Sequence, residues 1–188
     1  MTTLTIADLA RPEAKRQALL YDAALVIGGS MLIALSALVA FRIGPVPVSA
    51  QTLAVVLIGA TLGSKRGALA VMAYLMEGMA GLPVFTHGGA NVPMTFGYIV
   101  GFIGAAYLVG LLAEQGWDRK MWKTMVMMAA GHVVIFASGL AWLYMILGVG
   151  VQKTLAAGLY PFLPGCVLKV LLATALLPVA WKVIKRRG

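Results

Sequence analysis

Long apolar runs that carry almost no charge dominate the sequence, and they constrain the fold more than any other feature. Residues 22–42, 96–115 and 121–147 each supply roughly the 20 apolar residues that a helix needs to cross a bilayer. Of the 188 residues, 61% are hydrophobic and only 11% are charged, and the mean hydropathy is +0.94. So few polar residues cannot cover the surface of a soluble domain, and the sequence predicts an integral membrane protein.

Charged residues and Gly/Pro clusters divide the apolar sequence into six segments. These predict transmembrane helices at about residues 22–42, 51–64, 66–82, 96–115, 121–147 and 165–184. The second and third segments are short and nearly adjacent, which predicts a tight helical hairpin supported by its neighbours. The expected fold is an all-α bundle of six transmembrane helices. It is expected to form one domain over residues 21–188, after an N-terminal segment at 1–20.

The positions of the basic residues predict the orientation of this bundle, because Lys and Arg are enriched in cytoplasmic connectors. Arg42 and Lys153 fall on one side of the six predicted helices, and Lys169 falls inside the last. The other twelve basic residues share the opposite side: Arg11, Lys15, Arg16, Lys65, Arg66, Arg119, Lys120, Lys123, Lys182, Lys185, Arg186 and Arg187. Both termini are therefore predicted to be cytoplasmic. This distribution accounts for the net charge of +9 without a nucleic-acid partner.

Two connectors marked by Gly and Pro fall on the predicted outer side. The first lies in GLPVFTHGGANVPMTFGY, residues 81–98, and the second spans residues 148–164. Irregular backbone near membrane depth is tolerated where it is buried in protein or lines a cavity. The connectors therefore predict an outward-facing binding site for a small molecule.

Lys169 is predicted to lie about one turn inside the sixth helix, where an ammonium group needs a partner, water or a path to the interface. Three interpretations are open. The side chain extends to the headgroups, it faces inward and meets an anionic ligand, or it pairs with Glu77 of the third helix.

Several uncharged side chains near the first outer connector are candidates for ligand contacts. Asn91 offers two donors and an acceptor, and Thr95 and Tyr98 follow it, although Thr95 also suits the N-cap of the fourth helix. Phe85 and Trp142 belong to a group of aromatic residues toward the outer side, which form either an interfacial belt or the wall of a pocket. The two histidines have no cluster of carboxylates beside them, so no metal site is predicted.

Three stretches carry a resemblance to a known family. They are PVPVSAQTLAVVLIGATLGSKRGALAVMAYLMEGMAGLPVF (residues 45–85), GYIVGFIGAAYLVGLLAEQG (97–116) and PFLPGCVLK (161–169). Together they closely resemble the BioY family, whose members are the biotin-binding S components of energy-coupling factor (ECF) transporters.

The resemblance implies a six-helix protein of the bacterial inner membrane that captures biotin from outside. It implies partners as well, namely a membrane coupling (T) subunit and two ABC-type ATPases, which supply the ATP hydrolysis. This chain has no P-loop of its own. The predicted partner surface includes Ala24, Gly28, Ser30 and Ala34 of the first helix, whose small side chains allow close approach. No cofactor is implied, since biotin is the transported ligand.

The resemblance also draws attention to two departures from the family pattern. The usual GPTGGY-like stretch appears here as VPMTFGY, which retains Gly97 and Tyr98. Where the family has Gly-Asp-x-x-Lys, this chain has Cys166 in place of the Asp and keeps Lys169. A neutral thiol is a poor acceptor for a urea N–H, which predicts weak biotin binding, another acceptor such as Asn91, or an altered variant.

Two alternatives remain at this stage. The same fold would serve a different small vitamin or anion. An intramembrane enzyme would need a nucleophile and base or a metal set buried together, and the sequence offers no such constellation.

Overall fold

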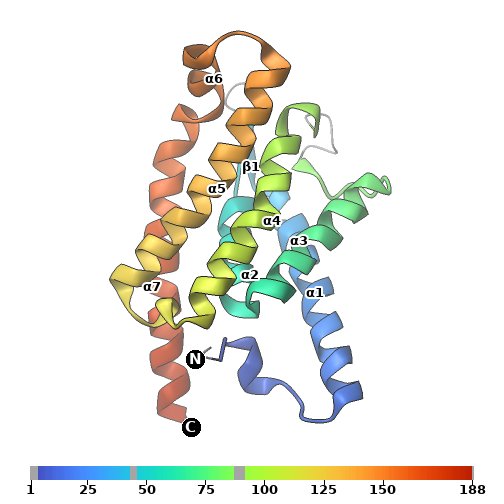
Figure 1. Cartoon of the computed structure of the whole chain (residues 1–188), viewed down its shortest axis with the longest axis vertical. Coiled ribbons are helices and arrows are strands. Elements are labelled where there is room, and N and C mark those ends of the chain that lie inside the picture. Colours follow the sequence, from blue (N-terminus) through green and yellow to red (C-terminus); the bar gives the residue numbers. More distant parts are fainter. Residues whose placement is uncertain (1–3, 43–45, 87–91, 188) are drawn as a thin grey trace.

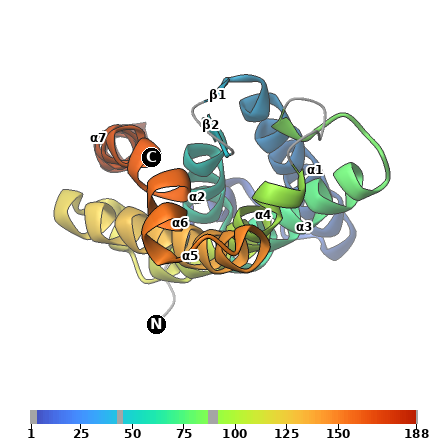
Figure 2. The same cartoon turned by 90° about the horizontal axis from the view of Figure 1, so that it is seen from above.

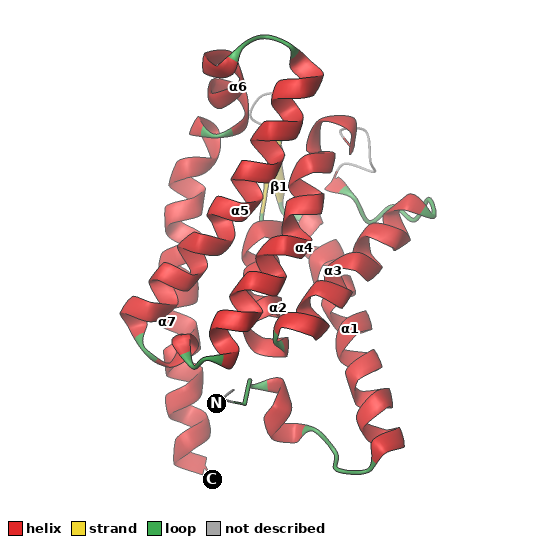
Figure 3. Ribbon diagram, in the orientation of Figure 1, coloured by secondary structure: helices red, strands yellow, loops and turns green. Residues whose placement is uncertain are grey.

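The structure, a computed structural model, describes residues 4–42, 46–86 and 92–187 and is almost entirely helical (Figure 3). Six long helices carry the fold, and the predicted count is confirmed: α1 (Lys15–Leu38), α2 (Gln51–Leu62), α3 (Ser64–Met79), α4 (Val92–Glu114), α5 (Met121–Leu147) and α7 (Leu163–Arg187). Short elements join them: η1 (Ala7–Ala10), β1 (Ala40–Arg42), β2 (Pro47–Ser49), η3 (Trp117–Arg119), α6 (Val151–Gly158) and η4 (Tyr160–Phe162).

Two predicted boundaries differ from the structure in ways that matter for the site. The first helix was predicted to continue to residue 42, but α1 ends at Leu38 and the chain turns into an antiparallel hairpin of β1 and β2. Pro47 in β2 lacks an N–H group and disfavours helix before it. The second outer connector was predicted as a loop, but it contains α6, which begins after Gly148 and Gly150, both at positive φ.

The long helices run alternately up and down, so both termini lie at one end of the bundle (Figure 1). The turn between α2 and α3 and the connector with η3 lie at this same end, whereas α6 lies at the opposite end. The predicted placement of both termini on one side is therefore confirmed. Among the described residues, four helical stretches are long and apolar enough to cross a membrane: 15–38, 93–114, 121–147 and 151–184.

Helix α2, the shortest of these six, forms the centre of the bundle (Figure 2) and contacts each of the other five. At ~1.5 Å per residue it is only about 18 Å long, less than the roughly 30 Å hydrocarbon core. Close packing compensates for this length. A Cβ atom on Gly59 would lie 2.5 Å from the Ala106 carbonyl oxygen of α4, and one on Gly67 of α3 would lie 2.9 Å from the Gly59 Cα.

Polar contacts tie the N-terminal segment to the end that carries the termini. Arg66 pairs with Asp8 and with Asp22, in both cases at 2.8 Å, and Arg11 pairs with Asp22 at 2.7 Å. Hydrogen bonds from Thr5 and Arg66 outweigh partial burial and hold the pKa of the Asp8 carboxyl below its usual value.

A buried carboxyl anchors α7 at the same end. Asp118 of η3 is completely buried and accepts a hydrogen bond from the indole N–H of Trp181 in α7. The Arg119 guanidinium lies over the Trp181 ring, 4.4 Å from its centroid, and also donates to the Leu4 carbonyl. Burial raises the pKa of Asp118, although the bond from Trp181 and the charge of Arg119 act in the opposite direction.

Candidate functional site

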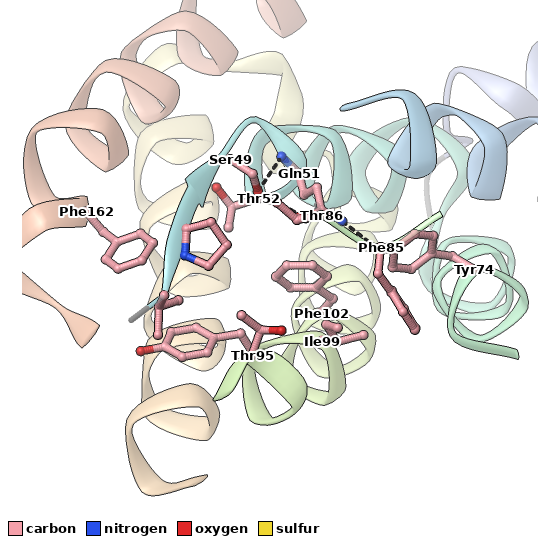
Figure 4. Close-up of a pocket in the computed structure, with 13 residues that line it drawn as sticks. Ser49, Gln51, Thr52, Tyr74, Phe85, Thr86, Thr95, Ile99, Phe102 and Phe162 are labelled. Carbon is pink, nitrogen blue, oxygen red and sulfur yellow. Dashed lines mark hydrogen bonds between the residues drawn. The ribbon is translucent and has the colours of Figure 1, made fainter. Parts of the chain in front are cut away.

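The best candidate for a binding site is a cavity in the half of the bundle away from the termini (Figure 4). It lies where β2 leads into α2, between α3, α4 and η4. Thirteen residues line it: Val46, Pro47, Ser49, Gln51, Thr52, Tyr74, Phe85, Thr86, Thr95, Tyr98, Ile99, Phe102 and Phe162. About two thirds of these have apolar or aromatic side chains, which is the usual composition of a small-molecule pocket.

Gln51, the first residue of α2, is the centre of the polar part of this wall. Its side-chain oxygen accepts hydrogen bonds from Thr86 Oγ1 at 2.8 Å and from Ser49 Oγ at 3.1 Å, and its Nε2 donates to Tyr74 Oη at 2.7 Å. Tyr74 Oη in turn donates to the Val84 carbonyl at 3.4 Å. The buried amide therefore joins β2, α3 and the connector after α3.

The bonds of the Gln51 amide also fix its orientation. Its oxygen has both acceptor positions occupied, whereas Nε2 has used one of its two N–H donors. One N–H donor of Gln51, in the wall of the cavity, therefore has no partner among the described residues.

Two aromatic pairs form opposite sides of the cavity. Tyr74 and Phe85 meet edge to face with ring centroids 5.5 Å apart, and Tyr98 and Phe162 stack at 6.1 Å. Tyr98 is held at its far end, because its hydroxyl donates to the Gly158 carbonyl of α6 at 2.9 Å. Phe85, Tyr98 and Phe162 are each less than a tenth exposed, so the walls are well packed.

Lys169 of α7 reaches the rim of the cavity from outside the lining set. Its ammonium donates to the Ser49 carbonyl at 2.5 Å and to Thr52 Oγ1 at 2.9 Å, and both residues line the cavity. In the described part of the chain no carboxylate lies within ion-pair distance of it. An ammonium has three donors, so the third donor of Lys169 has no partner among the residues that the structure describes.

The pairing of Lys169 with Glu77, one of the three open interpretations, is not seen among the described residues. Glu77 instead accepts a hydrogen bond of 2.8 Å from the buried hydroxyl of Ser30. Lys169 also does not extend toward the headgroups, because its side chain is part-buried against β2 and α2. Of the three interpretations, only the inward orientation agrees with the structure.

The structure brings together some of the predicted ligand-contact residues and separates others. Phe85, Thr95 and Tyr98 line the cavity, and α4 already begins at Val92, so Thr95 lies inside its first turn and is not its N-cap. Trp142 is elsewhere: it packs on Phe96 and donates to the Pro93 carbonyl at 2.8 Å.

Two further predicted residues cannot be placed in the cavity wall. Cys166 lines a separate groove between α5 and α7, so its prediction as a cavity residue is not met in this structure. Asn91 lies outside the described residues.

The four small residues predicted for the partner surface do not share one exposed face. Ala24 and Gly28 are exposed, and no atom lies within 4 Å of a Cβ built on Gly28. Ser30 is fully buried against α3, and Ala34 packs against the core. Residues that are four positions apart on a helix lie on the same face. Ser30 is only two positions after Gly28, so it lies about 200° around the helix axis from it. Ser30, which was predicted for the partner surface, therefore does not lie on the exposed surface of this structure.

Several cavity residues were not singled out for the site from sequence, notably Ser49, Gln51, Thr52, Tyr74 and Thr86. Polar residues at the ends of apolar segments are usually caps or interface residues, so their type alone carried little information. One signal was present, since Ser49, Gln51 and Thr52 stand together at the start of a predicted transmembrane helix.

A resident metal is not indicated by the part of the chain that the structure describes, where no group of three His, Cys, Asp or Glu side chains is placed to hold one. The chemistry available in the cavity is recognition. It offers apolar surface, hydroxyl and amide groups, and one ammonium at the rim.

Comparison with known proteins identifies close relatives. A profile of the BioY family matches residues 9–186. The chain is 33% identical over 158 residues to the biotin transporter BioY2 of Lactococcus lactis subsp. cremoris, an alignment that covers 82% of this chain and 87% of that protein. It is 36% identical over 146 residues to the biotin transporter BioY of Thermotoga maritima, with 76% and 85% covered.

The fold is similar to that of a solved structure. The crystal structure of the S component for biotin from an ECF-type ABC transporter superimposes with a TM-score of 0.75 at 23% identity, covering 91% of this chain and 95% of that one. At this identity the likeness concerns the fold.

Proposed function

This chain belongs to the BioY family, and we propose that it is the substrate-capture (S) subunit of an ECF-type transporter for biotin. It binds biotin in the cavity beside β2 and delivers it inward with a membrane coupling subunit and two ABC-type ATPase subunits. Its similarity to proteins named biotin transporters supports this ligand and supports transport over catalysis. Biotin is then cargo and not a resident cofactor.

The proposal includes a location and an orientation. The protein is a multi-pass protein of the bacterial inner membrane with both termini in the cytoplasm. The enrichment of basic residues at the end that carries the termini supports this orientation. The cavity then lies in the outer half of the bundle, and the N-terminal segment lies at the cytoplasmic surface.

The ammonium group of Lys169 at the rim of the cavity is the observation that carries the proposal. Biotin offers a urea carbonyl and a carboxylate as acceptors. The remaining donor of Lys169 suits either group, and its charge is balanced by no carboxylate among the described residues. The Gln51 amide supplies a second donor for a carbonyl, and the aromatic pairs supply apolar surface for the fused rings.

The cavity is smaller than the proposed ligand. The space open to the centres of water molecules is about 40 Å³, enough for a few waters at the roughly 10–15 Å³ that each needs. A bicyclic vitamin is larger, so lining side chains have to move apart when it enters. Binding is therefore coupled to a local opening of this wall.

Labelled biotin and purified protein in bilayer discs test the proposal. We expect saturable binding at a 1:1 ratio, with competition by unlabelled biotin. No binding at micromolar biotin by protein of confirmed helical content would overturn the proposed ligand. A panel of other vitamins in the same competition assay tests the alternative that the same fold captures a different small molecule.

A variant pair tests the role of Lys169. Loss of a charge-assisted hydrogen bond of about 1.5–3 kcal/mol predicts that Lys169→Met weakens biotin binding by about 10- to 150-fold. Lys153→Met is the matched control, because Lys153 is an exposed lysine on α6 at the same end of the bundle. Equal affinities of the two variants would refute the role of Lys169.

The exposed small residues of α1 support a contact with the coupling subunit. Ala24 and Gly28 allow a partner helix to approach the α1 backbone closely. We expect Gly28→Leu to weaken assembly of the complex, measured by co-purification, and to leave biotin binding intact. Loss of both properties together would contradict a separate partner surface.

A further inference from the structure

A second hollow on the molecule is unrelated to the cavity in chemical character. It is a groove of about 540 Å³ between α5 and α7, and the residues that line it include His132, Phe136, Leu140 and Cys166. Only His132 and Cys166 contribute side-chain polar atoms other than thioether sulfur. The groove runs along two membrane-spanning helices, so its surroundings are hydrocarbon.

The imidazole of His132 is the unusual feature of this groove. His132 is only 2% exposed, and its Nδ1 lies 2.9 Å from the Met128 carbonyl oxygen one turn earlier in α5. A carbonyl accepts only, so Nδ1 carries the proton and donates. Nε2 then holds a lone pair and is an acceptor, and it has no hydrogen-bond partner in the described structure.

Apart from His132 itself, the only side-chain donor among the residues that line the groove is the thiol of Cys166, which is a weak one. A single water there would find His132 and little else, whereas buried waters typically make about three hydrogen bonds. The lining is otherwise apolar and favours a hydrocarbon body. The complementary occupant has an apolar body and a single O–H group.

We propose that this groove is a binding site for a membrane-soluble alcohol, whose hydroxyl donates to Nε2 of His132 and whose hydrocarbon chain lies along α5 and α7. His132 is separated from Leu140, which also lines the groove, by eight residues of α5, or about 12 Å. This stretch suits an extended chain of about eight carbons.

The groove and the biotin cavity are separate sites. Phe136 lines the groove, Phe162 lines the cavity, and their rings meet at a centroid distance of 6.0 Å. These two rings form a partition, so the binding of an alcohol in the groove can be tested whether or not biotin binds in the cavity.

Nitrogen NMR of ring-labelled histidine tests the proposal directly. The chain has two histidines, His87 and His132, and a His87→Ala variant assigns the signals. The protein is placed in discs of saturated phosphatidylcholine, a lipid without a hydroxyl donor, and titrated with 1-octanol. We expect the Nε2 signal of His132 to move upfield and to saturate, while the Nδ1 signal stays in place.

The isomer heptyl methyl ether is the matched control, because it has the same atoms and no O–H group. We expect at least tenfold weaker binding of the ether and no movement of the Nε2 signal. No saturable shift with 1-octanol, or the same shift with the ether, would overturn the proposal.

A Cys166→Ala variant removes the thiol, the other possible donor in the groove. If this change moves the Nε2 signal before any alcohol is added, the thiol already occupies the acceptor and the proposal is wrong. If the octanol shift is unchanged in the variant, the site recognises the hydroxyl through His132.

Discussion

The side-chain amide of Gln51 provides the sharpest test of how the cavity is held together. Gln51→Leu keeps the approximate volume and removes three hydrogen bonds, to Tyr74 and from Ser49 and Thr86. Hydrogen bonds within membrane proteins are worth about 0.6 kcal/mol on average, and those in soluble proteins about 1 kcal/mol. Three of them predict a loss of about 2–3 kcal/mol in the free energy of unfolding.

Two further variants separate the contributions within this network. Thr86→Val keeps the side-chain shape and removes only the hydrogen bond from Thr86 to the Gln51 oxygen, so we expect a smaller effect than for Gln51→Leu. Tyr74→Phe should cost about 0.6–1 kcal/mol in the wild-type background and clearly less beside Gln51→Leu, because only the long bond to the Val84 carbonyl is then left to lose.

Unfolding in mixed micelles of increasing denaturing detergent, followed by circular dichroism, measures these free energies. Biotin titration of the same variants shows whether the loosened wall also loses ligand, and we expect Gln51→Leu to bind at least tenfold more weakly. A cost below about 0.5 kcal/mol for Gln51→Leu, or strict additivity with Tyr74→Phe, would refute the idea that the amide joins these elements.

Three other predictions concern separate parts of the molecule. Cys166 lines the groove and not the cavity, so Cys166→Asp, although it places a carboxylate one turn from Lys169, should leave biotin affinity within about threefold of wild type in a titration; a gain of about tenfold would show that the acid reaches the ligand. Gly59→Ala should lower the free energy of unfolding by about 1–3 kcal/mol, since its Cβ meets the α4 backbone, whereas Gly28→Ala, with open space around it, should be neutral or stabilising; equal effects would contradict the packing argument. Burial raises the folded-state pKa of Asp118, so the folded protein binds its proton more tightly and this carboxyl lowers stability as pH rises from about 3.8 through the raised pKa. Asp118→Asn should therefore gain stability relative to wild type as the pH rises above about 3.8, and parallel unfolding profiles of the two proteins would refute this effect.

Apolar segment length, the distribution of basic residues and the order of the family motifs were sufficient to predict the membrane class, six helices and the common side of both termini. These properties depend on local composition, because a helix in lipid satisfies its own backbone and basic residues act near the ends of each span. The candidates Phe85, Tyr98 and Lys169 were also identified from sequence, and they lie at the cavity. In the sequence these polar and aromatic residues lie within or next to apolar segments, where such residue types are uncommon.

The tertiary structure alone decided which polar groups meet. Gln51 joins Ser49, Tyr74 and Thr86, and Lys169 bonds a strand 120 residues earlier and not Glu77. These contacts depend on where the hairpin of β1 and β2 folds back and on how closely glycines let α2 approach α3 and α4, and neither distance is encoded in local periodicity. The same packing turned Ser30 inward and left the buried acceptor of His132, a residue that lines the groove, without a partner among the described residues. Composition determined that the chain lies in a membrane, whereas the contacts between helices determined what it offers to a ligand.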